Sequence, residues 1–271
     1  MTRYSLHDGE YLAIRRGAVR RDADGFFLLC GPGAEPNERH GAVGIVNVRG
    51  SLVHHAGFAD SYDAVYTRVR DAMDGKSGDE ERGTLKTDDP PGAVLLRIDS
   101  PGGVVSGCFE TVARLRALSR ERGIPLVAYV DETAGSAAYA LACACEEIAG
   151  PATCVVGSVG VISTMATVMS AEAKAGVRVV LIASGEFKAD GNPHGPLTDG
   201  AVTRERERVM DLAREFFALV AKARGMSAAK VEGMKAAVAL GRRARTMGLI
   251  DRVESFDATI AAIDTGRNGS L

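Results

Sequence analysis

The chain has 271 residues, 46% of them hydrophobic and 25% charged, which is typical of a folded protein with a sizeable core. Its net charge is −2 with both signs mixed throughout, whereas a nucleic-acid-binding protein usually presents a basic face. No apolar run approaches the roughly 18 residues that span a bilayer, and the N-terminus lacks the apolar core of a secretory signal. We therefore expect a cytoplasmic protein with no nucleic-acid partner and no membrane anchor.

The five cysteines are odd in number and lie in apolar stretches, at positions 30, 108, 143, 145 and 154. Cys143 and Cys145 have the wrong spacing for a zinc knuckle, and no matching Cys or His pair follows them. We interpret all five as reduced core residues, and we expect neither a metal nor a cofactor.

The first 91 residues are of mixed character. Residues 1–40 contain two short apolar patches and an arginine cluster, which predicts an N-terminal arm or a short hairpin. A strand is predicted over 42–48, and apolar residues at helical spacing predict a helix over 58–73. Residues 74–91 are charged, bounded by Gly and Pro and without periodicity. We predict an exposed flexible loop there, with a mobile flap or a self-cleavage site as the alternative.

From residue 93 onward, predicted strands alternate with predicted helices. The near-continuous apolar run 93–98 is typical of a strand buried in a parallel sheet, and it ends in a turn at 99–103. Further strands are predicted over 124–130, 152–156 and 177–183, with helices over 106–122 and 168–175. This alternation indicates an α/β fold with a parallel sheet. After a loop at 184–197 the chain is predicted to be helical to its end, over 199–224, 227–237 and 242–247, before GLID at 248–251.

Three stretches contain candidate catalytic groups, and the first is SPGG at 100–103. Pro101 fixes its own φ, while Gly102 and Gly103 permit positive φ, so a backbone N–H can point into the space beyond the strand. An oxyanion hole requires such a fixed donor. Alone the motif is a weak signal, because many strand-to-helix turns contain two glycines.

The second candidate is Ser136, which lies where a strand passes into an alanine-rich helical segment. A serine at this point can simply cap the helix, and that alternative stays open. The catalytic interpretation is that its hydroxyl is exposed as a nucleophile, with its own N–H or that of its neighbour beside the same space.

The third candidate is Lys188, the only lysine in the loop 184–197. A serine nucleophile needs a base, and burial can lower a lysine pKa by several units, enough to free its amine near neutral pH. The alternatives are that Lys188 is a solvated loop residue, or that His194 in the same loop is the base. None of the five histidines lies in a recognisable triad context.

Four motifs in this order resemble one known family. They are DSPGG at 99–103, GSAAY at 135–139, GSVGV at 157–161 and SGEFKADGNPHGPLT at 184–198. Together they resemble the signal peptide peptidase A/protease IV family of Ser–Lys peptidases, and most of all its phage and prophage head-maturation (capsid) proteases. The resemblance covers about residues 42–253 and implies a Clp/crotonase-like spiral of ββα units with a helical C-terminal region. Residues 41–271 would then be the peptidase domain and 1–40 an N-terminal arm or extension.

The resemblance also implies roles for individual residues. Ser136 matches the nucleophile, Lys188 the general base, and Ser158 a serine that orients the lysine amine. The backbone N–H groups of Gly103 and Ala137 match the two donors of the oxyanion hole.

The implied function is a soluble serine endopeptidase that cleaves polypeptides, such as capsid or scaffold proteins during phage head maturation. The implied assembly is a homo-oligomeric ring or dome in the host cytoplasm or the phage procapsid. The lack of an N-terminal anchor argues against signal-peptide cleavage, and the end at Leu271 implies that any scaffold is a separate product. The alternatives are a crotonase-like acyl-CoA enzyme and a non-catalytic, ring-forming scaffold.

Overall fold

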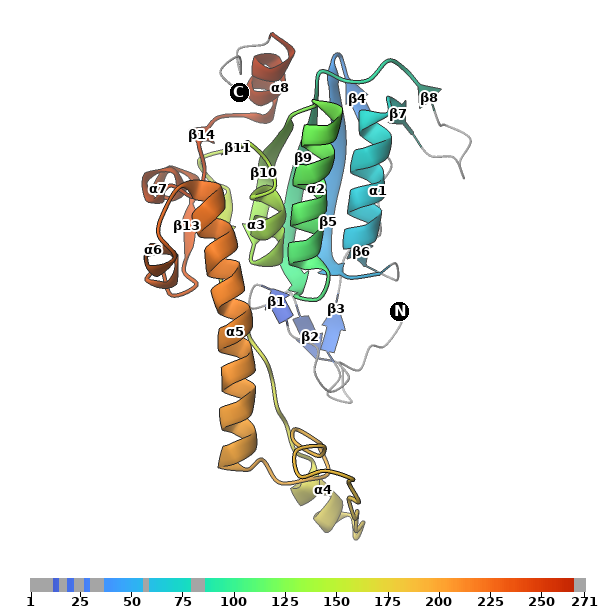
Figure 1. Cartoon of the computed structure of the whole chain (residues 1–271), viewed down its shortest axis with the longest axis vertical. Coiled ribbons are helices and arrows are strands. Elements are labelled where there is room, and N and C mark those ends of the chain that lie inside the picture. Colours follow the sequence, from blue (N-terminus) through green and yellow to red (C-terminus); the bar gives the residue numbers. More distant parts are fainter. Residues whose placement is uncertain are drawn as a thin grey trace.

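The computed structural model describes residues 12–14, 19–21, 27–29, 37–55, 59–78 and 86–265. Its centre is a largely parallel sheet in the spatial order β13-β12-β10-β9-β5-β4 (Figure 1). These strands are β4 (Glu38–His40), β5 (Val43–Val53), β9 (Ala93–Val104), β10 (Leu126–Gly135), β12 (Val155–Gly157) and β13 (Val238–Leu240). The four inner strands are mutually parallel, and the two outer ones are antiparallel to their neighbours. This confirms the predicted α/β class with a parallel sheet.

Shorter strands complete the sheet or form separate pairs. Strands β1 (Leu12–Ile14), β6 (Asp60–Ser61), β11 (Glu147–Gly150) and β14 (Arg252–Val253) join the sheet. Strands β2 (Val19–Arg21) and β3 (Phe27–Leu29) pair antiparallel, as do β7 (Lys76–Ser77) and β8 (Lys86–Thr87). The predicted loop at 74–91 therefore contains a strand pair, and its residues 79–85 lie outside the described part of the chain.

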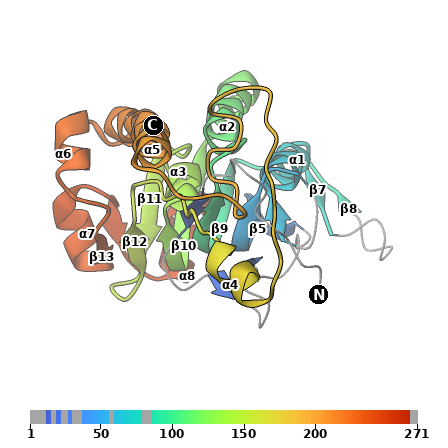
Figure 2. The ribbon, with the colours of Figure 1, turned by 90° about the horizontal axis from the view of Figure 1, so that it is seen from below.

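Helices cover both faces of the sheet. Helices α1 (Tyr62–Met73), α2 (Cys108–Arg122), α3 (Ala137–Ala142) and α5 (Asp199–Arg224) lie along one face (Figure 2). Helix α8 (Phe256–Asp264) packs on the opposite face, where Ile260 joins a smaller cluster that includes Ile45 and Leu95. Burial on two faces explains the near-continuous apolar sequence of β5 and β9.

Strands β9 and β10 extend beyond their predicted ends. The SPGG segment, predicted to be a turn, continues β9 because β5 remains paired with it through Ser51 opposite Gly102 and Leu52 opposite Gly103. Likewise β10 runs on to Gly135, with Ala134 opposite Ser100 of β9. A partner strand thus continues a strand through residues that would favour a turn in isolation, at the cost of an irregular register at Pro101.

Residues 162–208, here called the arm, project from the body of the molecule (Figure 1). The arm contains helix α4 (Met169–Lys174), the coil on either side of it and the first part of α5. The prediction of a strand over 177–183 was wrong, because these residues form coil. They have β-prone side chains, but a strand needs a partner to pair with, and no described strand lies beside them.

The C-terminal region agrees in part with the prediction. Helix α5 has the predicted bounds, with Thr198 capping the N–H of Ala201 at its start and Gly225 in the left-handed conformation at its end. Helix α6 (Ala228–Glu232) is shorter than predicted, and α7 (Gly241–Met247) agrees closely. Strand β14 and helix α8 after GLID were not predicted. Within the described part of the chain, none of the helices combines the length and the hydropathy of a membrane span.

A buried ion pair connects β6 to α1. Arg68 donates to both carboxylate oxygens of Asp60, at 3.0 and 2.7 Å, and to the carbonyl of Asn47 at 2.9 Å. The side chain of Asp60 is 1% exposed, so its charge depends on Arg68 rather than on water. Removing one partner of a buried pair leaves an uncompensated charge in the interior.

We predict that Arg68→Ala lowers the free energy of unfolding by about 3–5 kcal/mol. The matched control is Arg214→Ala, which breaks the exposed ion pair with Asp211 and should change stability by less than about 1 kcal/mol. Urea denaturation of both variants measures the difference. Equal midpoints would show that the Asp60–Arg68 pair adds no more than a surface contact.

Candidate active site

The register of two adjacent parallel strands sets two serines side by side. Gly135, the last residue of β10, lies opposite Gly157, the last residue of β12, and Ser136 and Ser158 are the residues that follow these two strands. Neighbouring strands lie about 4.8 Å apart, so both serines begin at the same level of the sheet. Both have positive φ, 50° for Ser136 and 56° for Ser158. Non-glycine residues rarely adopt this conformation, and such strained positions concentrate at functional sites.

Ser136 is held by backbone contacts and does not cap the helix that follows it. Its N–H donates to the carbonyl of Gly157 at 2.8 Å, and its hydroxyl donates to the carbonyl of Gly160 at 3.4 Å. The side chain makes no capping hydrogen bond to α3, and the residue is 1% exposed. The capping alternative therefore does not describe this serine.

Because the N–H of Ser136 is already hydrogen-bonded to Gly157, an oxyanion donor beside the Ser136 hydroxyl must come from a neighbouring residue. Ala137 is the first residue of α3, and the first bond of this turn runs from the N–H of Ala140 to the carbonyl of Ser136. The N–H of Ala137 belongs to the first turn, where backbone donors have no partner inside the helix. It is the donor adjacent to the Ser136 hydroxyl.

Glycines of β9 and β10 allow the backbones of β5, β9 and β10 to approach closely. A Cβ on Gly103 would lie 1.9 Å from the carbonyl oxygen of Leu52, so no side chain fits there. Gly102 alone of the two has positive φ, 110°, and its N–H donates to the Ser100 hydroxyl at 3.1 Å. A Cβ on Gly135 would lie 2.8 Å from the carbonyl oxygen of Pro101. The strand that leads to Ser136 is thereby packed directly against the SPGG segment.

Lys188 lies in the arm and is exposed. Arg204 of α5 holds the loop on both sides of it: its guanidinium lies 4.0 Å from the centre of the Phe187 ring, and its Nε donates to Asp190 at 2.7 Å. The ammonium of Lys188 makes no hydrogen bond or ion pair within the described residues. The chain by itself thus gathers Ser136, Ser158 and the SPGG segment, but it does not bring Lys188 to them.

His194, the rival base, is also a residue of the arm. Its Nδ1 pairs with the carboxylate of Glu172 in α4, and its backbone N–H donates to Asn192 at 3.0 Å. The contact with Glu172 joins the loop around His194 to α4, while the contact with Asn192 is local to the turn.

Tyr62 was not recognised from the sequence as a residue that supports the site. Its fully buried hydroxyl donates to the carbonyl of Val104, the residue after Gly103, at 2.6 Å. Burial raises the pKa of Tyr62 well above its usual value, so the hydroxyl keeps its proton and remains a donor. Its position in the helical apolar pattern of 58–73 had indicated only a core residue.

The buried thiols cannot serve as the nucleophile. Burial raises the pKa of Cys108 and of Cys143 to about 12, and that of Cys154 to about 11. Burial also raises the pKa of Cys145. A cysteine attacks as its thiolate, which these four do not form at neutral pH.

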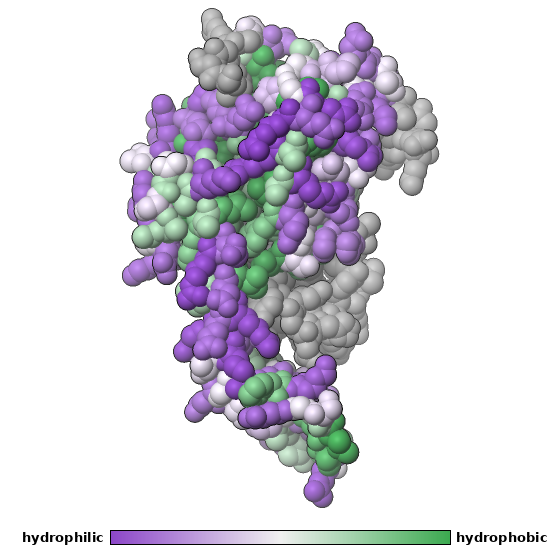
Figure 3. All heavy atoms as spheres, in the orientation of Figure 1, coloured by the Kyte–Doolittle hydropathy of each residue, from purple (hydrophilic) through white to green (hydrophobic). Residues whose placement is uncertain are grey.

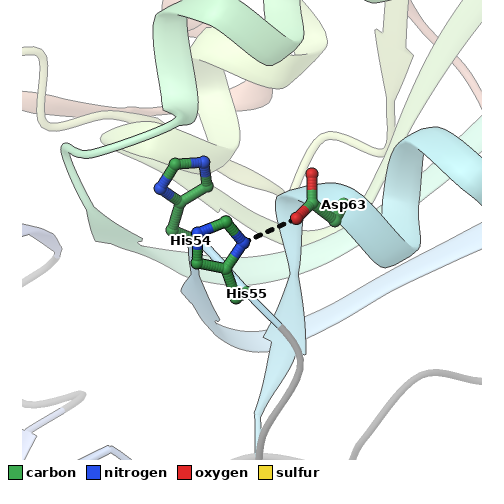
Figure 4. A group of neighbouring side chains, drawn as sticks. All are labelled: His54, His55 and Asp63. Atoms are coloured by element: carbon green, nitrogen blue, oxygen red, sulfur yellow. Dashed lines mark hydrogen bonds and ion pairs between the residues drawn. The ribbon is translucent and has the colours of Figure 1, made fainter.

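One group of described side chains has donor atoms close enough to hold a metal ion, namely His54, His55 and Asp63 (Figure 4). The two imidazole rings stack 3.9 Å apart, and His55 pairs with Asp63 at 2.7 Å. Two imidazoles and a carboxylate suit an ion such as Zn²⁺. However, Arg114 also binds Asp63, at 3.3 Å, and the group follows β5 rather than the strands that lead to Ser136 and Ser158. A serine–lysine reaction has no need of this group.

We predict that Gly103→Ala destabilises the fold, because the added methyl group would overlap the Leu52 carbonyl. Overpacking of this kind typically costs about 1–3 kcal/mol. Gly92→Ala is the control, since a Cβ there would meet no atom closer than 3.7 Å. Thermal unfolding followed by circular dichroism compares the two. Similar melting temperatures for both variants would contradict the close approach at Gly103.

The chain is similar in sequence to known proteins. The sequence profile of Peptidase family S49 matches residues 118–269. The chain is 32% identical over 236 residues to head-tail preconnector protein GP5 of Enterobacteria phage P21. This alignment covers 84% of this chain and 44% of the phage protein. It is 36% identical over 170 residues to capsid assembly protease C of Escherichia phage lambda, an alignment that covers 61% of this chain and 37% of the lambda protein. It is 37% identical over 95 residues to the probable protease SohB of Haemophilus influenzae, an alignment that covers 35% of this chain and 27% of SohB.

The chain therefore spans less than half the length of each of these three relatives. The profile match covers more than half of the chain and includes Ser136, Ser158 and Lys188. It confirms the resemblance first stated from the four motifs: the chain belongs to peptidase family S49.

Proposed function

We propose that this chain is a serine peptidase that cleaves polypeptides, with Ser136 as nucleophile and Lys188 as general base. The observation that supports it most is the conformation of Ser136, which has positive φ at a strand-to-helix junction beside the N–H of Ala137. In a member of a peptidase family, a strained serine beside such a donor is the natural candidate for the nucleophile.

In the proposed reaction, the Ser136 Oγ attacks the substrate carbonyl while its proton passes to the neutral amine of Lys188. The N–H groups of Gly103 and Ala137 stabilise the oxyanion of the tetrahedral intermediate. As the C–N bond breaks, Lys188 returns the proton to the leaving amine. Lys188 then deprotonates a water molecule, which hydrolyses the acyl-enzyme. Ser158 orients the lysine amine through its hydroxyl.

Because Lys188 lies on the arm, away from Ser136, the proposed catalytic pair needs a way to bring the two residues together. A lysine in water holds its proton, so the amine must enter a dry environment before it can act as a base. We propose that the arm reaches a neighbouring copy of the chain, so that Lys188 of one subunit serves Ser136 of another.

The surface of the arm supports an assembly of several copies. Apolar side chains gather at its free end (Figure 3). Large apolar residues that are more than one-third exposed include Ile162, Val168, Met169, Val177, Val179, Val180, Leu181, Ile182, Phe187, Leu197 and Val202. Extended exposed apolar surface of this kind marks a site of protein–protein contact. A homo-oligomeric ring or dome built through the arm would cover it, and the Clp/crotonase-like spiral is the fold we propose for the body.

The phage relatives suggest the class of substrate. One is named a capsid assembly protease and another a head-tail preconnector protein. We propose that this chain cleaves capsid or scaffold proteins during head maturation, in the host cytoplasm or the procapsid.

We predict that Ser136→Ala and Lys188→Ala each lower the rate of polypeptide cleavage by on the order of 10⁴-fold or more, as is typical when a nucleophile or its base is removed. Lys174→Ala, which removes another lysine of the arm, should leave the rate unchanged, and so should His194→Ala. Mass spectrometry of products from a denatured protein substrate measures the rates. An active Lys188→Ala protein together with an inactive His194→Ala protein would identify His194 as the base.

Mixing the two inactive variants tests the shared site. Subunits that exchange would combine Ser136 of one variant with Lys188 of the other, so activity should reappear in the mixture. Light scattering confirms that both variants assemble. A mixture that stays inactive after unfolding and refolding together would place both residues of each site in one subunit. Wild-type protein without any cleavage activity would leave the non-catalytic scaffold as the explanation.

A further inference from the structure

Strand β1, near the start of the chain, lies against the segment of β9 that contains the proposed oxyanion donor. The two strands are antiparallel, with Leu12 opposite Val104, Ala13 opposite Gly103 and Ile14 opposite Gly102. Figure 1 shows β1 at the end of the sheet from which the arm also projects. The N-terminal segment thus adds a strand at the SPGG motif.

The pairings of β9 show which of its edges β1 occupies. Strand β5 holds one edge as far as Leu52 opposite Gly103. Strand β10 holds the other edge only as far as Ala134 opposite Ser100, and the chain then turns away at Ser136. Strand β1 therefore takes the edge that β10 vacates, on the same side of β9 as Ser136.

An extended polypeptide substrate would need this same edge. Its reacting carbonyl must meet the N–H of Gly103 while lying within reach of the Ser136 hydroxyl. Adding a strand to an open sheet edge is a general way for proteins to bind extended peptides, because the backbone hydrogen bonds supply affinity for many sequences. Strand β1 and a substrate strand therefore cannot be bound together.

We infer that residues 12–14 are an internal occupant of the substrate-binding edge and compete with the substrate for it. This inference rests on the proposed function for its regulatory meaning, while the placement of β1 can be tested without activity. Because β1 belongs to the same chain, its local concentration is high and does not fall on dilution. Substrate must displace it before cleavage begins.

The placement can be tested with a pair of introduced cysteines, Leu12→Cys and Val104→Cys, in a Cys30→Ser background. Directly opposed residues of antiparallel strands have Cα atoms about 4.5–5.5 Å apart, within the range that a disulfide requires. The control pair Ile14→Cys and Val104→Cys is two residues out of register. Mild oxidation should cross-link the first pair within one chain and the control pair far less. Equal cross-linking of the two pairs, or cross-links only between chains, would overturn the inference.

The same cross-link tests the competition. The oxidised Leu12→Cys/Val104→Cys protein should lose peptidase activity and regain it when reduced, whereas the control pair should be unaffected by oxidant. Full activity of the cross-linked protein would reject β1 as a competitor and leave the proposed function intact. If the cross-link forms but both the reduced variant and the wild type are inactive, the result would instead count against the proposed function.

A proline variant provides an independent kinetic readout. Ala13→Pro removes a backbone N–H and disfavours the paired strand. If β1 holds the edge about nine-tenths of the time, KM for a peptide substrate should fall about tenfold in this variant with kcat unchanged. Ala18→Pro, between β1 and β2 in the sequence, is the control. Unchanged KM in Ala13→Pro would argue against competition.

Discussion

The candidate site depends on the close approach of three parallel strands, β9, β10 and β12, at their carboxyl ends. Gly135 makes this approach possible twice, because it lies opposite Gly157 in β12 and its missing side chain admits the carbonyl of Pro101 in β9. With any larger residue, the backbones would have to separate. Ser136 would then lose the contact of its N–H with Gly157 and its position beside the SPGG segment.

Much of this arrangement could be predicted from the sequence. The alternation of strands and helices predicted a parallel α/β sheet, and the four motifs identified the family that the profile match confirms. The location of Ser136 at a strand-to-helix junction was also predicted. These features are local, since they depend on periodicity and on a few residues that are adjacent in the chain.

The remaining features depend on partners distant in the sequence. Pro101 and Gly102 favour a turn, yet β9 continues past them, because β5 pairs with it again from Gly102 onward after an irregularity in the register. Residues 177–183 favour a strand, yet they form coil because no described strand lies beside them. The role of Tyr62 depends on the Val104 carbonyl, 42 positions away, which no local pattern indicates. Tertiary contacts thus override local preference in both directions.

The contacts of Arg204 with the residues on either side of Lys188 have an energetic consequence for the proposed assembly. With Phe187 and Asp190 already fixed to α5, the loop that carries the amine is shaped before any second molecule arrives. Docking would then cost little more than the conformational entropy of the Lys188 side chain. A flexible loop would also lose the backbone entropy of several residues. In the proposed assembly, association would therefore be limited by how two rigid surfaces meet rather than by the folding of a loop.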